Sequence, residues 1–306
     1  MPVYTIKGLP AAAILKREGV AVADGESAAA RPPRVLLLNL MPQKQVTELD
    51  LLRALALAGR DIEVTLVKIA GQTYKTTPME HMEAFYVDFD CLADGFYEGL
   101  VVTGAPVEHL PFEQVRYWPQ LCAIMDWARS HVRSTLYICW GAQAALYHFY
   151  GIGKHSLAQK MFGVFSQRVI RAVPLLSGLP DPFPMPNSRH TEVRTEEFPS
   201  TPDLEVVVRS EESGLGVALG RDGREVYVAG HLEYAPETLD REYRRDLAKG
   251  LPIQPPAHYY EADDPSRPVV DSWRGACRAF YANWVRRYVA APFPDGPEAP
   301  SEEGEP

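Results

Sequence analysis

From residue 34 onward, the hydrophobic positions form two kinds of run that alternate along the chain. Short continuous apolar runs predict buried strands at residues 35–40, 62–69, 100–103 and 135–138. Runs with apolar residues three and four positions apart predict helices at residues 47–57, from 77 onward, at 112–129 and at 142–150. Strands that alternate with helices in this way predict a parallel sheet covered on both faces.

Residues that favour helix ends indicate where two of the helices begin or stop. We expect Thr77 to be an N-cap, with Pro78 at the first helical position and Glu80 completing a capping box. A later helix should begin at Pro236, and Gly250 should follow its last turn.

Beyond residue 150 the pattern changes to shorter strands. We expect these at residues 162–170, 204–209, 216–219 and 225–229, followed by the helix at 236–250 and a final amphipathic helix at 273–289. The pattern as a whole predicts an α/β fold. Its sheet should be mostly parallel, with helices on both faces and additional short antiparallel strands in the C-terminal half.

The chain divides into three parts by composition. Residues 1–33 predict an N-terminal arm, with one short helical piece and an Ala/Gly/Pro-rich connector. Residues 34–291 predict a single α/β domain, a large but permitted size for one unit. Residues 292–306 are rich in Pro, Gly and Glu, which predicts a disordered tail.

Charge and cysteine usage narrow the class of protein. The formal net charge is -9, which disfavours nucleic acid and anionic membrane as partners. No run approaches the roughly 20 apolar residues that a membrane span needs, and the N-terminus lacks a signal-peptide layout. The four cysteines are widely scattered, which favours free thiols in a reducing cytoplasm.

One strand ends at a potential nucleophile. The run at 135–138 stops at Cys139, and a small-residue turn then leads into the helix at 142–150. A nucleophile on such a turn is held clear of its own backbone. It also faces a helix N-terminus, where unpaired N–H groups favour a thiolate or an oxyanion. Free cysteines are usually inert and buried, and we interpret the other three in that way.

A base and an acid follow another strand end. The run at 225–229 is followed by His231 and Glu233, and residues two apart in an extended chain share a side. The carboxylate can therefore orient the imidazole, which can act as the base for a thiol. With Cys139 this set predicts covalent catalysis. It does not fit a zinc site, because no further Cys or His lies at ligand spacing, so we expect no metal.

The remaining candidate positions have two interpretations each. The turn Gly104-Ala105-Pro106 is either a plain strand-to-helix turn or, with the backbone N–H of Trp140, an oxyanion hole. The polar segment 187–192 favours a solvated loop over a binding site. Lys160 and Arg245 look like surface residues, the latter in a helix rich in Arg and Lys.

Five longer motifs occur in order along the chain: TGAPVEHLPFEQVRYW, ICWGAQAALYHFYGI, NSRHTEV, GHLEY and EYRRDLAKGL. Together with LPAAAIL and LNLMP nearer the N-terminus, they resemble the homoserine O-acyltransferase family of methionine biosynthesis, the MetA type. The resemblance runs from Met1 to Val289. This family resembles a class I glutamine amidotransferase fold used for acyl transfer, which agrees with the strand–helix alternation.

The resemblance implies acyl-CoA-dependent acylation of the L-homoserine hydroxyl by a ping-pong route, in a homodimer without metal or redox cofactor. Matched by motif, Cys139 is the acyl-accepting nucleophile, His231 the general base and Glu233 its orienting acid. The substrate-binding positions of the family match Lys160, Ser188 and Arg245. A guanidinium suits a carboxylate because it binds in a bidentate fork.

The resemblance also bears on the acyl group. Members with Gly at the second position after Gly-Ala-Pro resemble succinyl transferases, and members with Glu there resemble acetyl transferases. This chain has Glu108. Its carboxylate would fill the acyl pocket and repel a succinyl carboxylate, so we expect acetyl-CoA as co-substrate. The alternative is that Glu108 points to solvent and selects nothing.

Other functions remain open at this stage. A succinyl-CoA enzyme on the same scaffold is the nearest. A glutaminase could use the same three residues, but no synthetase domain is evident, and the turn lacks Gly-x-Cys-x-Gly. A non-catalytic binding protein is disfavoured by the intact Cys-His-Glu set.

Overall fold

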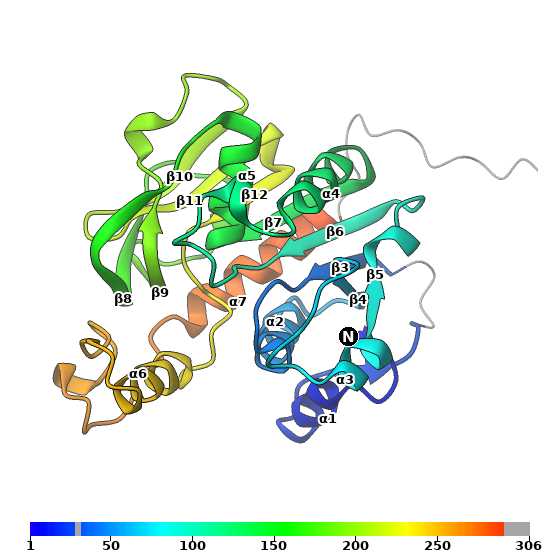
Figure 1. Ribbon diagram of the computed structural model, residues 1–306, viewed down its shortest axis with the longest axis horizontal. Helices are drawn as coiled ribbons and strands as arrows, with labels where there is room; N and C mark the ends of the chain where they lie inside the picture. The colour runs from blue at the N-terminus through cyan, green and yellow to red at the C-terminus, as the bar shows by residue number, and fades with distance from the viewer. Residues whose placement is uncertain (28–31, 291–306) are drawn as a thin grey trace, which may run out of the picture.

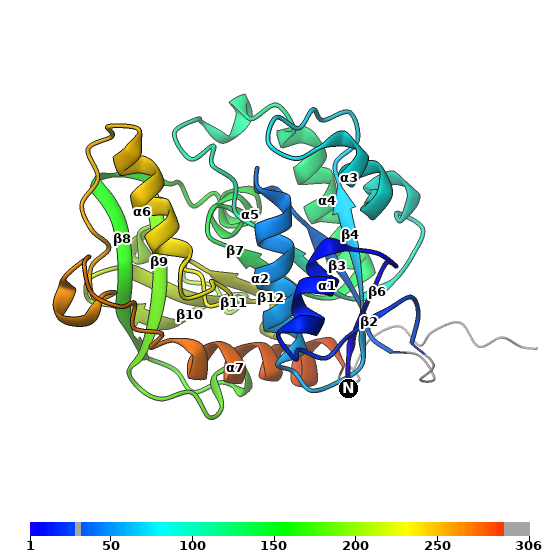
Figure 2. The same ribbon diagram turned by 90° about the horizontal axis from the view of Figure 1, so that it is seen from below.

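The computed structural model describes residues 1–27 and 32–290, which form one twelve-stranded sheet with helices on both faces (Figures 1 and 2). The strands are β1 (Val3–Thr5), β2 (Val22–Asp24), β3 (Arg34–Leu38), β4 (Ile62–Lys68), β5 (Tyr86–Asp88), β6 (Tyr97–Val102), β7 (Val132–Ile138), β8 (His155–Val169), β9 (Phe183–Glu192), β10 (Leu204–Ser210), β11 (Gly214–Gly220) and β12 (Glu225–Val228). The helices are α1 (Pro10–Arg17), α2 (Lys44–Ala56), α3 (Met79–Phe85), α4 (Trp118–His131), α5 (Trp140–Tyr150), α6 (Thr238–Ala248) and α7 (Arg274–Asn283), the last continuing as a π-helix over Trp284–Val289.

The sheet has a parallel half and an antiparallel half. Its order is β2-β1-β4-β3-β6-β7-β12-β11-β10-β8-β9, with β5 beside β4. Every pair from β2 to β12 is parallel, and every pair from β12 to β9 is antiparallel. The predicted fold class is confirmed, although β8, with 15 residues, is longer than the short strands we expected there.

The continuous apolar runs become strands because both faces of the parallel half are covered. Along β3, Val35 and Leu37 pack into one hydrophobic core and Leu36 and Leu38 into the other. The first core also receives α1, α2 and α7, and the second receives α4 and α5. Side chains that alternate between two dry faces leave no polar position in such a strand.

The segment expected as an arm takes part in the sheet where it is described. β1 pairs with β4 and β2 pairs with β1, both in parallel. The helical piece expected within it is α1. Strands of three residues are too short to show a period in the sequence, so the pattern could not predict them. The tail expected at 292–306 lies outside the described residues.

Several predicted helix starts were wrong, including that of α6, which begins at Thr238 and not at Pro236. α3 begins one residue later than predicted, with Pro78 as its N-cap and no side-chain cap. The Thr77 hydroxyl instead donates to the carbonyl oxygen of Pro42 at 3.0 Å. α2 begins at Lys44, three residues before its predicted start at 47. By contrast, Gly250 follows α6 with a φ of 69°, as predicted for a residue beyond a helix end.

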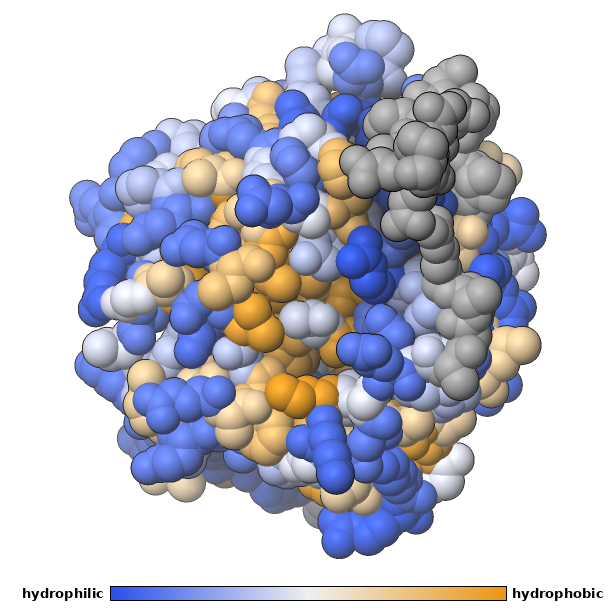
Figure 3. All heavy atoms as spheres, turned by 90° about the vertical axis from the view of Figure 1, so that its right-hand side faces the viewer, coloured by the Kyte–Doolittle hydropathy of each residue, from blue (hydrophilic) through white to orange (hydrophobic). Residues whose placement is uncertain are grey.

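The surface is mixed in polarity. On the face that Figure 3 shows, a central band of hydrophobic residues is surrounded by hydrophilic ones. Within the described part of the chain, no helix is both long and apolar enough to span a bilayer.

Candidate active site

A cavity of about 580 Å³ lies where several strands of the parallel half end. It is lined by the loop after β3, the turn after β6, Cys139 after β7 and His231 after β12. β8, β9 and α6 form its other side, and α6 lies beside the ends of those two strands (Figure 2). The volume is in the range of ligand pockets, and the carboxyl ends of parallel strands are where such pockets form.

Cys139 lies at the turn that joins β7 to α5. Its backbone N–H donates to the carbonyl oxygen of Val228 at 2.8 Å, so the sheet holds the residue from behind. Its φ of 52° and ψ of -117° are unusual for a residue with a side chain and cost on the order of 1–3 kcal/mol. Although Cys139 is only 8% exposed, it lines the cavity. This is the strand-to-helix geometry that the sequence pattern predicted.

Two glycines bring the neighbouring turns together. A Cβ on Gly141 would lie 2.7 Å from the carbonyl oxygen of the residue after β6, so a larger residue would push α5 away from that strand. A Cβ on Gly104 would lie 3.4 Å from Cys139 Cβ and 3.6 Å from the amide nitrogen of Trp140. The turn that contains Ala105 therefore lies beside the Trp140 amide, where we expect the oxyanion hole.

His231 and Glu233 lie behind the thiol. His231 Nδ1 is 2.7 Å from Glu233 Oε1, and the Cys139 thiol is a further side-chain hydrogen-bond partner of the imidazole. The Tyr234 ring stacks on the imidazole with centroids 4.1 Å apart. Tyr281 donates to the second oxygen of Glu233 at 3.5 Å. The sequence brought these three residues together by strand-end arguments, and the fold places them in one cluster.

The surroundings of His231 strongly change the pKa of its imidazole. Burial alone would lower the pKa of His231, but the Glu233 carboxylate and the Cys139 sulfur outweigh it and raise that pKa to about 10. The imidazole is therefore held in its protonated form at neutral pH. A proton on His231 can be given to a leaving group, and a carboxylate behind it keeps the ring in place.

Glu242 of α6 brings the three predicted substrate-binding residues together. Its carboxylate lies 2.7 Å from Lys160 Nζ, accepts from the Ser188 hydroxyl at 2.9 Å and lies 3.5 Å from the Arg245 guanidinium. Arg245 also binds Asp246 through two nitrogens, at 2.6 and 2.9 Å. All five line the cavity. The surface interpretation does not hold for Lys160, whose side chain is 15% exposed, whereas Arg245 is exposed at the surface as well as lining the cavity.

The interpretation of segment 187–192 as a solvated loop was wrong, because it lies in β9 and pairs with β8. Ser188 and His190 face the cavity, whereas Asn187, Arg189 and Thr191 are buried on the other side. This alternation is the period of a strand. Composition hid it because both faces carry hydrogen-bonding side chains.

Glu108 lies in the same cavity as Cys139. Its Oε2 accepts the backbone N–H of His190 at 2.9 Å, and the Thr191 hydroxyl is 3.4 Å away. The carboxylate is therefore anchored to β9. The alternative in which it points to solvent does not describe this arrangement.

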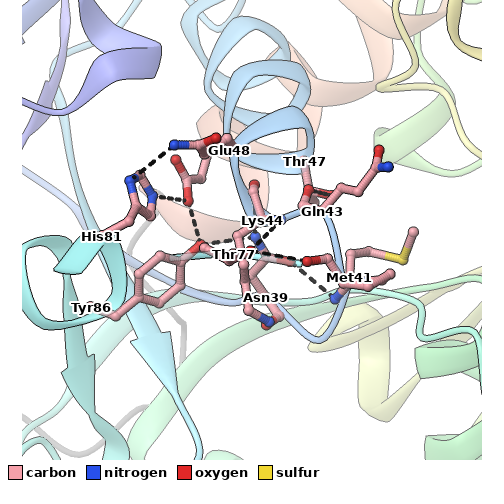
Figure 4. Close-up of polar contacts among 11 residues, drawn as sticks. Asn39, Met41, Gln43, Lys44, Thr47, Glu48, Thr77, His81 and Tyr86 are labelled. Atoms are coloured by element: carbon pink, nitrogen blue, oxygen red, sulfur yellow. Dashed lines mark hydrogen bonds and ion pairs between the residues drawn. The ribbon is translucent and has the colours of Figure 1, made fainter. Parts of the chain in front are cut away.

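A buried polar network holds the cavity wall at the start of α2 (Figure 4). Glu48 accepts from Tyr86 at 2.7 Å and lies 2.9 Å from His81 Nε2. The Asn39 amide donates to Tyr86 at 2.9 Å, and its oxygen accepts the Met41 amide at 3.1 Å. The loop that carries Met41 into the cavity is thereby fixed from inside the protein.

Lys44 completes this network. Its ammonium donates to the carbonyl oxygen of Asn39, and it lies 5.1 Å from the centre of the Tyr74 ring. Burial lowers the pKa of Lys44 to about 8, although Glu48 acts in the opposite direction. Burying a charged ammonium costs free energy unless it is paired. The contacts of Lys44 with the loop therefore offset the cost of its burial.

Sequence reasoning missed three charged residues of the site. Glu242 was hidden in a helix that looked exposed. Asp50 of α2 lines the cavity, and burial together with the Glu233 carboxylate raises its pKa to about 7. Arg189 is buried, donates to the carbonyl oxygens of Thr191 and Ser213, and is coupled electrostatically to Cys139. The burial of Arg189 follows from the folded structure, so no local sequence pattern could have identified it.

The fold and the cluster define a class of protein: a class I glutamine amidotransferase-like α/β protein with a cysteine at the strand-to-helix turn. A glutamine amidotransferase from Thermotoga maritima has this fold, with a TM-score of 0.57 and 14% identity, over 86% of this chain and all of that one. The family model described as homoserine O-succinyltransferase matches residues 2–294, and this chain belongs to that family.

Curated relatives agree over nearly the full length. A homoserine O-acetyltransferase from Parabacteroides distasonis is 50% identical, with 94% of each chain covered. One from Phocaeicola vulgatus is 47% identical over 94% of this chain and 96% of the relative. One from Geobacillus kaustophilus is 44% identical over 94% and 97%.

Proposed function

We propose that this protein is a homoserine O-acetyltransferase of methionine biosynthesis, a cytoplasmic homodimer that transfers acetyl from acetyl-CoA to the hydroxyl of L-homoserine. The observation that carries the proposal is the position of Cys139 in one cavity with His231, Glu108 and the Glu242 cluster. The curated relatives above carry the same name.

The first half-reaction loads the thiol. The Cys139 sulfur, having given its proton to His231, attacks the carbonyl carbon of acetyl-CoA. The negative charge that forms on the carbonyl oxygen is stabilised by the backbone amides of Ala105 and Trp140. The carbon–sulfur bond to CoA then breaks, and the CoA sulfur takes the proton from His231. Acetyl-Cys139 remains.

The second half-reaction reverses the roles. The hydroxyl of homoserine gives its proton to His231, and its oxygen attacks the acetyl carbon. The bond to Cys139 breaks, the sulfur regains its charge beside the imidazolium, and O-acetyl-L-homoserine leaves. Glu233 keeps the ring oriented through both steps.

The polar side of the cavity suits the amino-acid end of homoserine. Arg245 can receive its carboxylate, because guanidinium pairs with carboxylates in two parallel hydrogen bonds. Glu242, which already collects Lys160 and Ser188, can receive its ammonium group. Both charges of the substrate then have a partner within one turn of α6.

Glu108 supports acetyl over succinyl. Its carboxylate is fixed to β9 through the His190 amide, so it cannot simply swing away from a longer acyl group. A succinyl carboxylate placed beside it would meet a like charge in a partly dry site.

The test is side-by-side turnover of acetyl-CoA and succinyl-CoA with L-homoserine, in wild type and in Glu108→Gly. We expect wild type to prefer acetyl-CoA and the variant to shift toward succinyl-CoA. A wild type that prefers succinyl-CoA would instead favour homoserine O-succinyltransferase, the runner-up on the same site.

A further inference from the structure

Three metal-binding side chains meet at one end of the cavity. Glu108, His109 and His190 each offer a ligand atom, and these atoms all lie within 4.8 Å of one another. The two imidazole rings are 4.9 Å apart between centroids. Glu108 and His109 follow β6, whereas His190 belongs to β9, so the sequence alone shows no ligand spacing here.

The three side chains have lone pairs to offer. Glu108 accepts the His190 amide at Oε2, and a carboxylate has a second oxygen that can also act as a ligand. The ring contact between the two histidines is tilted by 48°, so the rings do not shield each other's nitrogens by stacking. Burial lowers the pKa of His190, although the Glu108 carboxylate acts against this.

We propose that Glu108, His109 and His190 form a site for a divalent transition-metal ion, with Zn²⁺ as the best fit. Two imidazoles and one carboxylate are a common donor set for Zn²⁺, and they leave a fourth position open. A site with two imidazole nitrogens is poorly suited to Mg²⁺ and Ca²⁺, because these ions prefer oxygen ligands. The open position faces the cavity, since all three residues line it.

To bind Zn²⁺ together, the three ligand atoms would have to move only slightly closer to one another. Ligand atoms around tetrahedral Zn²⁺ lie roughly 3.3 Å apart, given bonds of about 2.0–2.1 Å. His109 is exposed and can rotate to close the difference. The nearby Lys160 ammonium, which acts on His190, is neutralised by Glu242 at 2.7 Å. Its charge therefore opposes a bound cation less than its position suggests.

A bound ion would change the acyl pocket, and this consequence rests on the proposed function. The ion neutralises the Glu108 carboxylate and presents an open coordination position to an incoming carboxylate. Succinyl-CoA would then be accepted better relative to acetyl-CoA.

The binding test uses the full-length chain without its reactive thiol, because a thiol beside an imidazole also binds Zn²⁺. Calorimetric titration with ZnCl₂ compares Cys139→Ser with the double variant Cys139→Ser/His109→Ala. We expect affinity to fall by roughly 100-fold, because losing a direct ligand should cost at least as much as the 10–100-fold lost with an outer-shell partner. Cys139→Ser/His258→Ala is the matched control. His258 also lies near a carboxylate, that of Glu212 at 3.3 Å, and should leave affinity unchanged.

Co²⁺ provides a second measurement that does not depend on activity. Its visible absorption should appear in Cys139→Ser and disappear with His109→Ala. Equal Zn²⁺ affinity with and without His109 would overturn the site, and it would leave the proposed acetyl transfer untouched. In active enzyme, Zn²⁺ should raise the succinyl-to-acetyl turnover ratio only when His109 is present. An unchanged ratio would overturn the effect on the acyl pocket.

Discussion

At the scale of single residues, the backbone of Cys139 shows what the site costs the fold. A φ of 52° with a ψ of -117° suits glycine and strains any residue with a Cβ. The strain is maintained because β7 and α5 fix both ends of the turn and the Val228 carbonyl holds the amide. A side chain in this conformation stands clear of its own backbone.

This strain predicts an unusual order of stabilities. Cys139→Gly should be more stable than Cys139→Ala by about 1 kcal/mol, because relief of roughly 1–3 kcal/mol of strain exceeds the usual glycine penalty of about 0.5–1 kcal/mol. Urea unfolding of the two variants measures the difference. An alanine variant as stable as the glycine variant would show that the turn is unstrained.

The raised pKa of His231 makes stability depend on pH. Because the folded-state pKa, about 10, lies above the ordinary value of 6.5, the contribution is complete below pH 6.5 and is lost as the pH rises toward 10. Glu233→Gln removes the charge that raises this pKa. The stability advantage of wild type over Glu233→Gln should therefore be largest near pH 6 and shrink toward pH 10.

Denaturant unfolding at several pH values checks this trend. The comparison with Glu233→Gln removes the contributions of all other titrating groups that the two proteins share. An advantage that grows between pH 7 and pH 10 would mean that His231 is neutral in the folded protein.

At the scale of elements, two structures position the cavity walls: the α6 face with β8 and β9, and the network at the start of α2. In α6, the residues Thr238, Arg241, Glu242 and Arg245 line the cavity at the spacing of one helix face. In α2, the cavity face and the buried network begin within the same first turns.

Loss of the Glu242 charge should affect the second half-reaction. Glu242→Gln leaves Lys160 and Arg245 without their shared carboxylate, so we expect the KM for L-homoserine to rise about tenfold, which corresponds to about 1.4 kcal/mol. Loading of Cys139 by acetyl-CoA should change little. Glu237→Gln is the control at the start of the same helix, because Glu237 is exposed and its partner is Arg241, at 3.4 Å. If the KM for L-homoserine is the same in both variants, Glu242 does not contribute to homoserine binding.

The α2 network should contribute to folding stability. Tyr86→Phe removes the hydroxyl that donates to Glu48 and accepts from Asn39, so two buried polar groups lose a partner. We expect a loss of about 2 kcal/mol. Tyr147→Phe removes an exposed hydrogen bond to Glu113 and should cost less than about 0.5 kcal/mol. Thermal or urea unfolding distinguishes the two, and equal costs would mean that the network is not tightly formed.

At the scale of the whole molecule, the sequence predicted the features that depend on the spacing of hydrophobic residues and on the residues that end strands and helices. Continuous apolar runs identified the parallel strands, and the strand ends identified Cys139 and His231. β9 was missed because polar residues occupy both of its faces, and β1 and β2 because they are only three residues long. The grouping of Glu242 with Lys160 and Ser188 depends on how three distant elements meet, which no local pattern contains.

The most direct test of the account is intact-protein mass spectrometry after mixing with acetyl-CoA in the absence of homoserine. We expect one acetyl group, mapped to Cys139 by peptide analysis and absent from Cys139→Ala. Addition of L-homoserine should remove it and yield O-acetyl-L-homoserine. An unmodified wild-type protein, or an acetyl group that persists in Cys139→Ala, would contradict the central claim.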